Sequence, residues 1–165
     1  MSQQAMYIAW GASNVIALFI LFAAFKWPSV ARLLLSLVFL WAAFINTYNA
    51  LLHPEVYLDY AKLTPVKLYR EIIEGPFSKS ITGYVIAIAT CQFLLALFTG
   101  HKGLLMKMAM WGAIVFLIAI APFGIGSGFP CTLILALAYY ILLKKKDHIP
   151  FIEFINRKIL KGKIT

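Results

Sequence analysis

Charged residues are scarce in this sequence, and they are unevenly distributed. Only 13% of the 165 residues are charged while 62% are hydrophobic, whereas a soluble domain carries about a quarter of charged residues. All six acidic residues and nearly all fifteen basic residues fall between long apolar runs. Because a soluble helix must keep one polar face in water, this pattern excludes a soluble domain and indicates an integral membrane protein.

Cysteine and histidine are scarce too, which limits the chemistry that we expect. Cys91 and Cys131 form no C-x-x-C motif, so neither a disulfide nor a redox dithiol is predicted. The three histidines include no facing pair for a haem and no zinc-ligand spacing, so no metal is predicted. No complete catalytic signature and no phosphate-binding glycine loop is present, so no catalytic residue is assigned, and a non-enzymatic role is favoured.

Apolar runs dominate the rest of the chain. A helix needs about twenty residues to cross a hydrocarbon core about 30 Å thick, and five runs are candidates: 5–25, 30–52, 81–99, 104–122 and 129–143. The last run is short and follows an uncharged, glycine-rich turn over 122–130. Either the membrane is thin there, or this turn dips below the headgroups under cover of neighbouring helices. We predict an all-α integral membrane protein with a bundle of five transmembrane helices over 1–146.

The basic residues predict the orientation of this bundle. Eleven of the fifteen fall on one side, in the C-terminal tail and in the loops that contain Lys26, Arg32, Lys102 and Lys107. The loop over 53–80, on the other side, has four bases balanced by four acids. The positive-inside rule then places the N-terminus outside and the C-terminus in the cytoplasm. We expect no ionised group in the interior of a span, which counts against an ion-coupled transporter.

Two amphipathic segments lie outside the predicted spans. In the outer segment 53–80, Thr64 as N-cap, Pro65 at the first helical position and Gly75 as a stop predict a short helix, on the membrane surface or across the mouth of the bundle. The tail 147–165 predicts a basic cytoplasmic helix held at the interface by anionic lipids. Its bases are not interleaved with exposed aromatic residues on a soluble surface, so no nucleic-acid partner is predicted.

The second run carries the richest polar pattern. Asn46, Asn49 and His53 are spaced i, i+3, i+7 and share one predicted helix face. Hydrogen bonding between helices is the simpler interpretation. The alternative is the polar wall of an outward-facing pocket, with His53 and Glu55 at its rim as proton-transfer groups.

Asn14 and Gln92 are the other deep polar groups, near the middle of the first and third runs. Contact between helices is again the simpler role, and their similar depth makes a direct pair conceivable. Small residues of the third run (Gly83, Ala87 and either Thr90 or Cys91) predict a face for close helix packing. The candidate ligand-binding residues are therefore Asn14, Asn46, Asn49, His53 and Gln92.

From residue 31 to about 146 the order of features resembles the DoxX family of small bacterial membrane proteins. The helix that opens Ala31-Arg-Leu-Leu-Leu-Ser is followed by His53-Pro-Glu-Val-Tyr-Leu-Asp-Tyr, an outer amphipathic stretch and three further spans. The resemblance implies a four-helix core to which 5–25 is an addition, and a place in a bacterial inner membrane. It also implies an association with sulfur- or quinone-linked oxidoreductases. No family motif matches closely enough to carry over a catalytic residue, and the emopamil-binding group is less similar because it places acids within its spans.

Three hypotheses for function follow. The first is an accessory or structural subunit that packs with a protein partner or a second copy of itself, around a quinone or a lipid. The second is a binder or carrier of a small neutral or lipidic molecule in an intramembrane pocket. The third is an outer-surface enzyme that uses His53 and Glu55. A stoichiometric protein partner would favour the first hypothesis, and a co-purified lipid or quinone the second.

Overall fold

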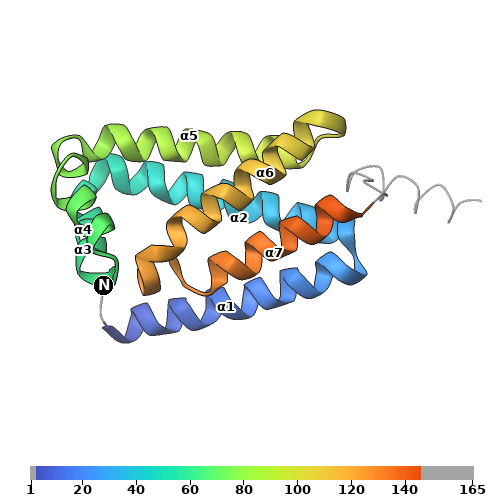
Figure 1. Ribbon diagram of the computed structural model, residues 1–165, viewed down its shortest axis with the longest axis horizontal. Coiled ribbons are helices and arrows are strands. Elements are labelled where there is room, and N and C mark those ends of the chain that lie inside the picture. Colours follow the sequence, from blue (N-terminus) through green and yellow to red (C-terminus); the bar gives the residue numbers. More distant parts are fainter. Residues whose placement is uncertain (1–2, 146–165) are drawn as a thin grey trace, which may run out of the picture.

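The computed structural model describes residues 3–145, and this part of the chain is helical with no strand (Figure 1). Five longer helices form the bundle: α1 (Gln3–Lys26), α2 (Pro28–Leu52), α5 (Ile81–Thr99), α6 (Gly103–Ile120) and α7 (Cys131–Lys144). Short helices connect them: η1 (Pro54–Tyr57), α3 (Tyr60–Leu63), α4 (Lys67–Glu74), η2 (Phe77–Lys79) and η3 (Ala121–Ser127). The predicted interfacial helix over 147–165 lies outside the described residues.

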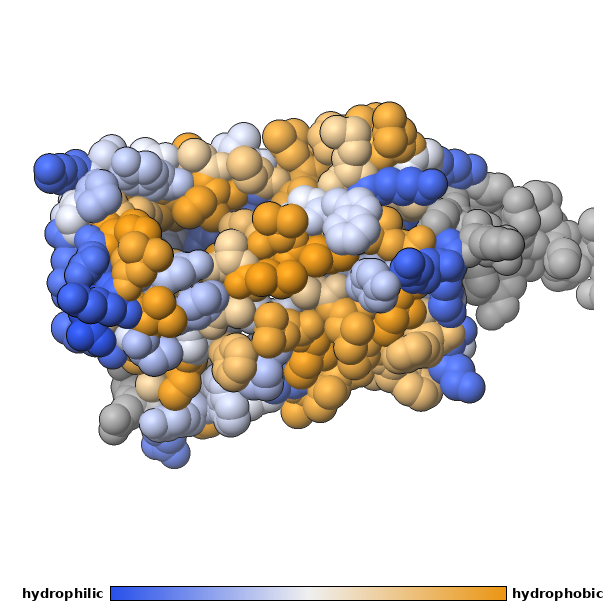
Figure 2. Space-filling view, in the orientation of Figure 1, coloured by the Kyte–Doolittle hydropathy of each residue, from blue (hydrophilic) through white to orange (hydrophobic). Residues whose placement is uncertain are grey.

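Four helices are long and apolar enough to cross a membrane: α1, α2, α5, and α6 with its continuation into η3. An apolar belt covers the middle of the molecule, and hydrophilic residues gather at its two ends (Figure 2). This is the architecture of a multi-pass membrane protein. Helix α7 has only 14 residues, which span about 21 Å at 1.5 Å per residue, less than the hydrocarbon core.

Helices α2 and α5 form the most extensive pair of the bundle, with α1 beside α2 and α7, and α6 between α5 and α7 (Figure 1). The buried residues of α5 are spaced alternately by four and three, which is the period of helices packed with a left-handed twist: Val85, Ala89, Gln92, Ala96 and Thr99. The predicted packing face was wrong, because Gly83, Ala87, Thr90 and Cys91 are all exposed. The face that packs is the one that carries Gln92.

The centre of the bundle is built on Phe39, which contacts the rings of Phe116 and Tyr139 at centroid distances of 5.9 and 5.8 Å. Around these rings the helices approach closely, because many of the buried residues are small: Ala17, Ala23, Ala24, Ala31, Ala113 and Ala138 are all fully buried. Small residues suit helix packing in a bilayer, where dispersion contacts replace the hydrophobic effect between helices.

The glycine-rich turn after α6 is held inside the bundle by side chains. Carbonyls left free where α6 ends accept hydrogen bonds from other segments: Ala119 from Tyr69 at 2.7 Å, Pro122 from Thr64 at 2.6 Å, Gly128 from Asn14 at 3.2 Å, and Phe129 from Trp10 at 2.6 Å. Irregular backbone is tolerated at membrane depth only when its polar groups are satisfied in this way. Since Trp10 and Asn14 lie two to three turns inside α1, these contacts favour the prediction that the turn dips below the headgroups.

The outer helix α4 differs from the prediction at its start. It begins at Lys67 with Val66 as N-cap, and not at Pro65 after a Thr64 cap. The Thr64 hydroxyl is instead turned inward, where it donates to Pro122 and accepts from the backbone amide of Val66. Tertiary contact with the turn therefore outweighs the local capping signal. The helix ends at Gly75, as predicted.

Arg32 corrects the expectation that no ionised group lies inside a span. It belongs to the second turn of α2 and not to a loop, and it is only 3% exposed. Its Nη2 donates to the carbonyls of Thr99 at 2.9 Å and His101 at 2.6 Å, where α5 ends. Its Nε and Nη1 are buried and make no hydrogen bond with any group of residues 3–145. Arg32 therefore closes the negative C-terminal end of α5.

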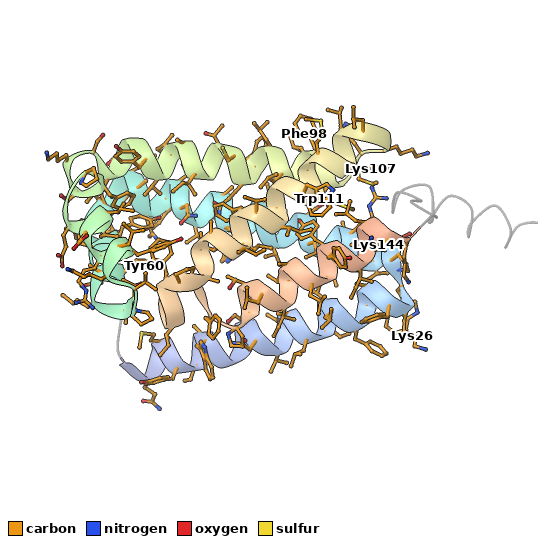
Figure 3. All side chains as sticks on the ribbon, viewed as in Figure 1. Lys26, Tyr60, Phe98, Lys107, Trp111 and Lys144 are labelled. Atoms are coloured by element: carbon orange, nitrogen blue, oxygen red, sulfur yellow. The ribbon has the colours of Figure 1, made fainter. Side chains whose placement is uncertain are left out.

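Charge separates the two ends of the described chain. All of its acids lie within 53–80, where four acids balance four bases, while the bases of the opposite end have no acid among them. Figure 3 shows Lys26, Lys107 and Lys144 together at this basic end, with Tyr60 at the other. The Lys145 ammonium donates to the Phe25 carbonyl at 2.6 Å, which joins the ends of α7 and α1.

Candidate functional site

A cavity of about 520 Å³ lies at the end of the bundle opposite the basic end. Its walls come from α2, α5 and α6, and it is covered by the outer segment and by η3. The residues that line it are mostly apolar or aromatic: Asn46, Tyr57, Tyr60, Tyr69, Ile72, Ile73, Phe77, Val85, Ile88, Gln92, Phe116, Ala119, Ile120, Phe123, Gly126 and Ser127. A volume of this size fits the range of small-molecule sites.

Aromatic rings form the outer cover of the cavity. Tyr60 stacks on Tyr57 at 6.0 Å and meets the edge of Phe123 at 5.8 Å, while Tyr69 of α4 contacts Phe123 from the other side at 5.1 Å. Gly126 makes this arrangement possible, because a Cβ there would lie 2.7 Å from a carbon of the Tyr60 ring. We call Tyr57, Tyr60, Tyr69 and Phe123 the aromatic cover.

The polar wall of the cavity is a chain of three side chains. The Tyr57 hydroxyl donates to Asn46 Oδ1 at 2.9 Å, and Asn46 Nδ2 donates to Gln92 Oε1 at 2.8 Å. The chain therefore joins η1, α2 and α5 and fixes the orientation of the Gln92 carboxamide. Within residues 3–145, Nε2 of Gln92 makes no hydrogen bond, although the side chain is only 4% exposed.

The two tyrosines nearest this chain stay protonated in neutral solution. Burial, together with the neighbouring Tyr60, raises the pKa of Tyr57 to about 12, although a side-chain interaction with Asn49 acts in the opposite direction. Burial also raises the pKa of Tyr60 above its usual value of 10.0. Both hydroxyls are therefore available as neutral hydrogen-bond donors.

The structure brings two of the five candidate residues together in this cavity. Asn46 and Gln92 line it and are hydrogen-bonded to each other. Asn14 does not reach Gln92, because its Nδ2 donates to the carbonyls of Trp10 and Gly128. Asn49 and His53 are not among the lining residues. Asn49 nevertheless lies near the Tyr57 hydroxyl, with which its side chain interacts.

His53 is the C-cap residue of α2 and directly precedes Pro54. Its Nδ1 is 3.7 Å from Glu55, so the two groups are close, but both side chains are more than half exposed. Neither lines the cavity, and residues 3–145 contain no cluster of side chains that could hold a metal ion. This pair is therefore a solvated surface contact, separate from the cavity.

Sequence reasoning missed the aromatic cover. Tyrosine is common at the membrane interface, so Tyr57 and Tyr60 by themselves give no specific signal of a site. The signal that could have singled them out is their density, since three tyrosines occur within 57–69, directly after the polar stretch of α2. Their convergence with Phe123 depends on contacts between distant segments.

Comparisons with known proteins return no match. No family model, no curated protein and no solved structure is similar to this chain. The resemblance to the DoxX family therefore stays an expectation.

Proposed function

We propose that this protein binds a small, neutral and largely apolar molecule in the cavity beneath the aromatic cover. The observation that carries the proposal is the composition of the cavity wall, which contains no charged residue and one hydrogen-bonded amide pair, Asn46 and Gln92. Apolar walls with a few fixed polar groups are typical of ligand pockets. An ion would find no counter-charge there, so a neutral ligand suits the site.

The other two hypotheses have less support. Among residues 3–145, no acid, histidine, cysteine or lysine lines the cavity to act as a general base, and the one lining serine, Ser127, donates its hydroxyl to the Gly124 carbonyl. An accessory subunit needs a surface for its partner, and the exposed apolar side chains of the described helices are equally suited to lipid. The accessory role, with a protein partner, a second copy or a quinone, therefore remains a hypothesis without an observation of its own.

The proposal is tested by adding apolar ligands to the purified protein and measuring its thermal unfolding. Ligands that bind only the folded state raise the melting temperature, and the rise grows with the logarithm of the ligand concentration above the dissociation constant. We expect stabilisation of the wild type and none of Ala119→Phe, because Ala119 lines the cavity and a phenyl ring fills its space. Ala87→Phe is the matched control, since Ala87 is exposed on α5 away from the cavity. Equal stabilisation of all three proteins would place the ligand on the lipid-facing surface and contradict the proposal.

The proposal includes five crossings of a bacterial inner membrane, with the basic end in the cytoplasm. In a protein with Cys91→Ser and Cys131→Ala, single cysteines are introduced at Lys62, Lys26 or Lys144. All three positions are exposed. We expect an impermeant thiol reagent to label Lys62→Cys in intact cells, and Lys26→Cys and Lys144→Cys only after permeabilisation. Labelling of Lys144→Cys together with Lys62→Cys would show that α7 does not cross.

A further inference from the structure

Most polar groups of the cavity are already engaged by the protein. Tyr57 donates to Asn46, Asn46 donates to Gln92, Tyr69 donates to the Ala119 carbonyl, and Ser127 donates to the Gly124 carbonyl. Within residues 3–145, no hydrogen bond is made by two polar groups that line the cavity, Nε2 of Gln92 and the hydroxyl of Tyr60. Nε2 can only donate, whereas the hydroxyl can donate or accept.

The direction of the hydrogen-bond chain explains why a donor faces the cavity. Oε1 of Gln92 is occupied by Asn46, whose own oxygen is occupied by Tyr57. The amide group of Gln92 is therefore held with its N–H groups as the free end. A donor that faces an apolar cavity without a partner gains a hydrogen bond when a ligand supplies an acceptor.

From this arrangement, and resting on the function proposed above, we infer that the ligand is a neutral amphiphile whose carbonyl oxygen accepts a hydrogen bond from Gln92. A carbonyl oxygen has two lone pairs and no proton, which suits a site whose free groups donate. The Tyr60 hydroxyl is the second donor available to it. Carboxylates and phosphates are disfavoured because no cation lines the cavity.

The exposure of the lining residues indicates that the ligand comes from the bilayer. Ile88 of α5 and Ile72 of α4 line the cavity and are also 37% and 45% exposed on the surface of the molecule, as is Ala119 of α6. These exposed lining residues lie among other exposed apolar side chains of α4, α5 and α6. Molecules that are dissolved in lipid can therefore reach the cavity wall from this side.

The test compares two probes of equal chain length, methyl nonyl ketone and undecane, which differ in the carbonyl group. Affinity is measured from thermal stabilisation of the purified wild type and of Gln92→Met, which keeps the length of the side chain but removes its N–H groups. We expect the wild type to bind the ketone about tenfold more tightly than undecane, as one hydrogen bond allows. In Gln92→Met this preference falls to about twofold or less. The carbonyl stretching frequency of the bound ketone provides a second readout, being lower in the wild type than in the variant.

The outcomes separate this inference from the proposed function. If both probes bind the wild type equally, and Gln92→Met leaves the carbonyl frequency unchanged, the carbonyl inference is wrong while the cavity remains a binding site. If neither probe stabilises the wild type more than Ala119→Phe, the binding site itself is wrong. Should Gln92→Met fail to fold, Tyr60→Phe takes its place, with a smaller loss of ketone preference expected.

Discussion

Replacing Arg32 by methionine lowers the free energy of unfolding by about 3 kcal/mol, since two charge-assisted hydrogen bonds of about 1.5 kcal/mol or more each are lost. Both bonds go to carbonyls at the C-terminal end of α5, those of Thr99 and His101, and the Thr99 carbonyl lies in the buried interior. Methionine fills a similar volume but donates nothing, so these carbonyls are left without their partner. The loss is measured by unfolding the protein in mixed micelles, with amide exchange at Gly100 and His101 as the local readout.

The cost of burying the Arg32 guanidinium acts against the loss of stability expected for Arg32→Met. Arg32 also has two buried nitrogens without a hydrogen bond, and removing a poorly satisfied buried charge can stabilise a protein. We expect the two carbonyl bonds to outweigh this gain, because they close a helix end where a positive charge is favoured. Lys107→Met is the control, since Lys107 is exposed on α6 at the same end. If Arg32→Met is as stable as this control, the cost of burying the guanidinium cancels its hydrogen bonds.

Replacing Asn46 by leucine lowers the free energy of unfolding by about 2 kcal/mol, since hydrogen bonds between membrane helices average about 0.6 kcal/mol and reach about 1.7. Two such bonds are lost, and both the Tyr57 hydroxyl and Oε1 of Gln92 lose their partner. The Gln92 carboxamide is then free to turn, so we also expect the preference for the ketone probe to fall.

Thr47→Val provides the control for this variant. Thr47 is adjacent in α2, and its hydroxyl donates only within its own helix, to Ala43 at 2.8 Å. We expect a change below about 0.5 kcal/mol for Thr47→Val, because the bond that it loses joins no other helix. If Asn46→Leu is as stable as Thr47→Val and keeps its ketone preference, the chain from Tyr57 to Gln92 contributes nothing to the site.

The contribution of Tyr57 to this chain also has a defined dependence on pH. The folded-state pKa is raised to about 12 from 10.0, so the folded state holds the proton more tightly than the unfolded state. The resulting stability is fully present below pH 10 and is lost as the pH rises through about 12. The Tyr57 hydroxyl of the polar wall therefore stays protonated throughout the physiological pH range.

Polar residues in an apolar run were the part of the site that the sequence could reveal. An amide in hydrocarbon is costly unless it is paired, so Asn46 and Gln92 were identifiable without a structure. Their pairing could not be predicted. Counting residues placed Gln92 at the same depth as Asn14, and it could not show which neighbouring helix the Asn46 face of α2 contacts. Only the packing of α2 on α5 brings Asn46 to Gln92 and leaves Asn49 and His53 out of the cavity lining.

By itself the sequence determined the helical membrane class, the positions of the long apolar helices and the stop at Gly75, because each depends on local hydrophobicity or backbone preference. Tertiary structure decided the rest. The Thr64 hydroxyl does not cap α4 but donates to a carbonyl of the turn. Arg32 lies within α2, and not in the predicted loop, and donates to a carbonyl at the end of α5. The cavity arises in the same way, since its cover needs Tyr60 and Phe123 to meet. Each of these contacts joins segments that are far apart in the chain. Their energies depend on which polar groups would have no hydrogen-bond partner once the helices are packed.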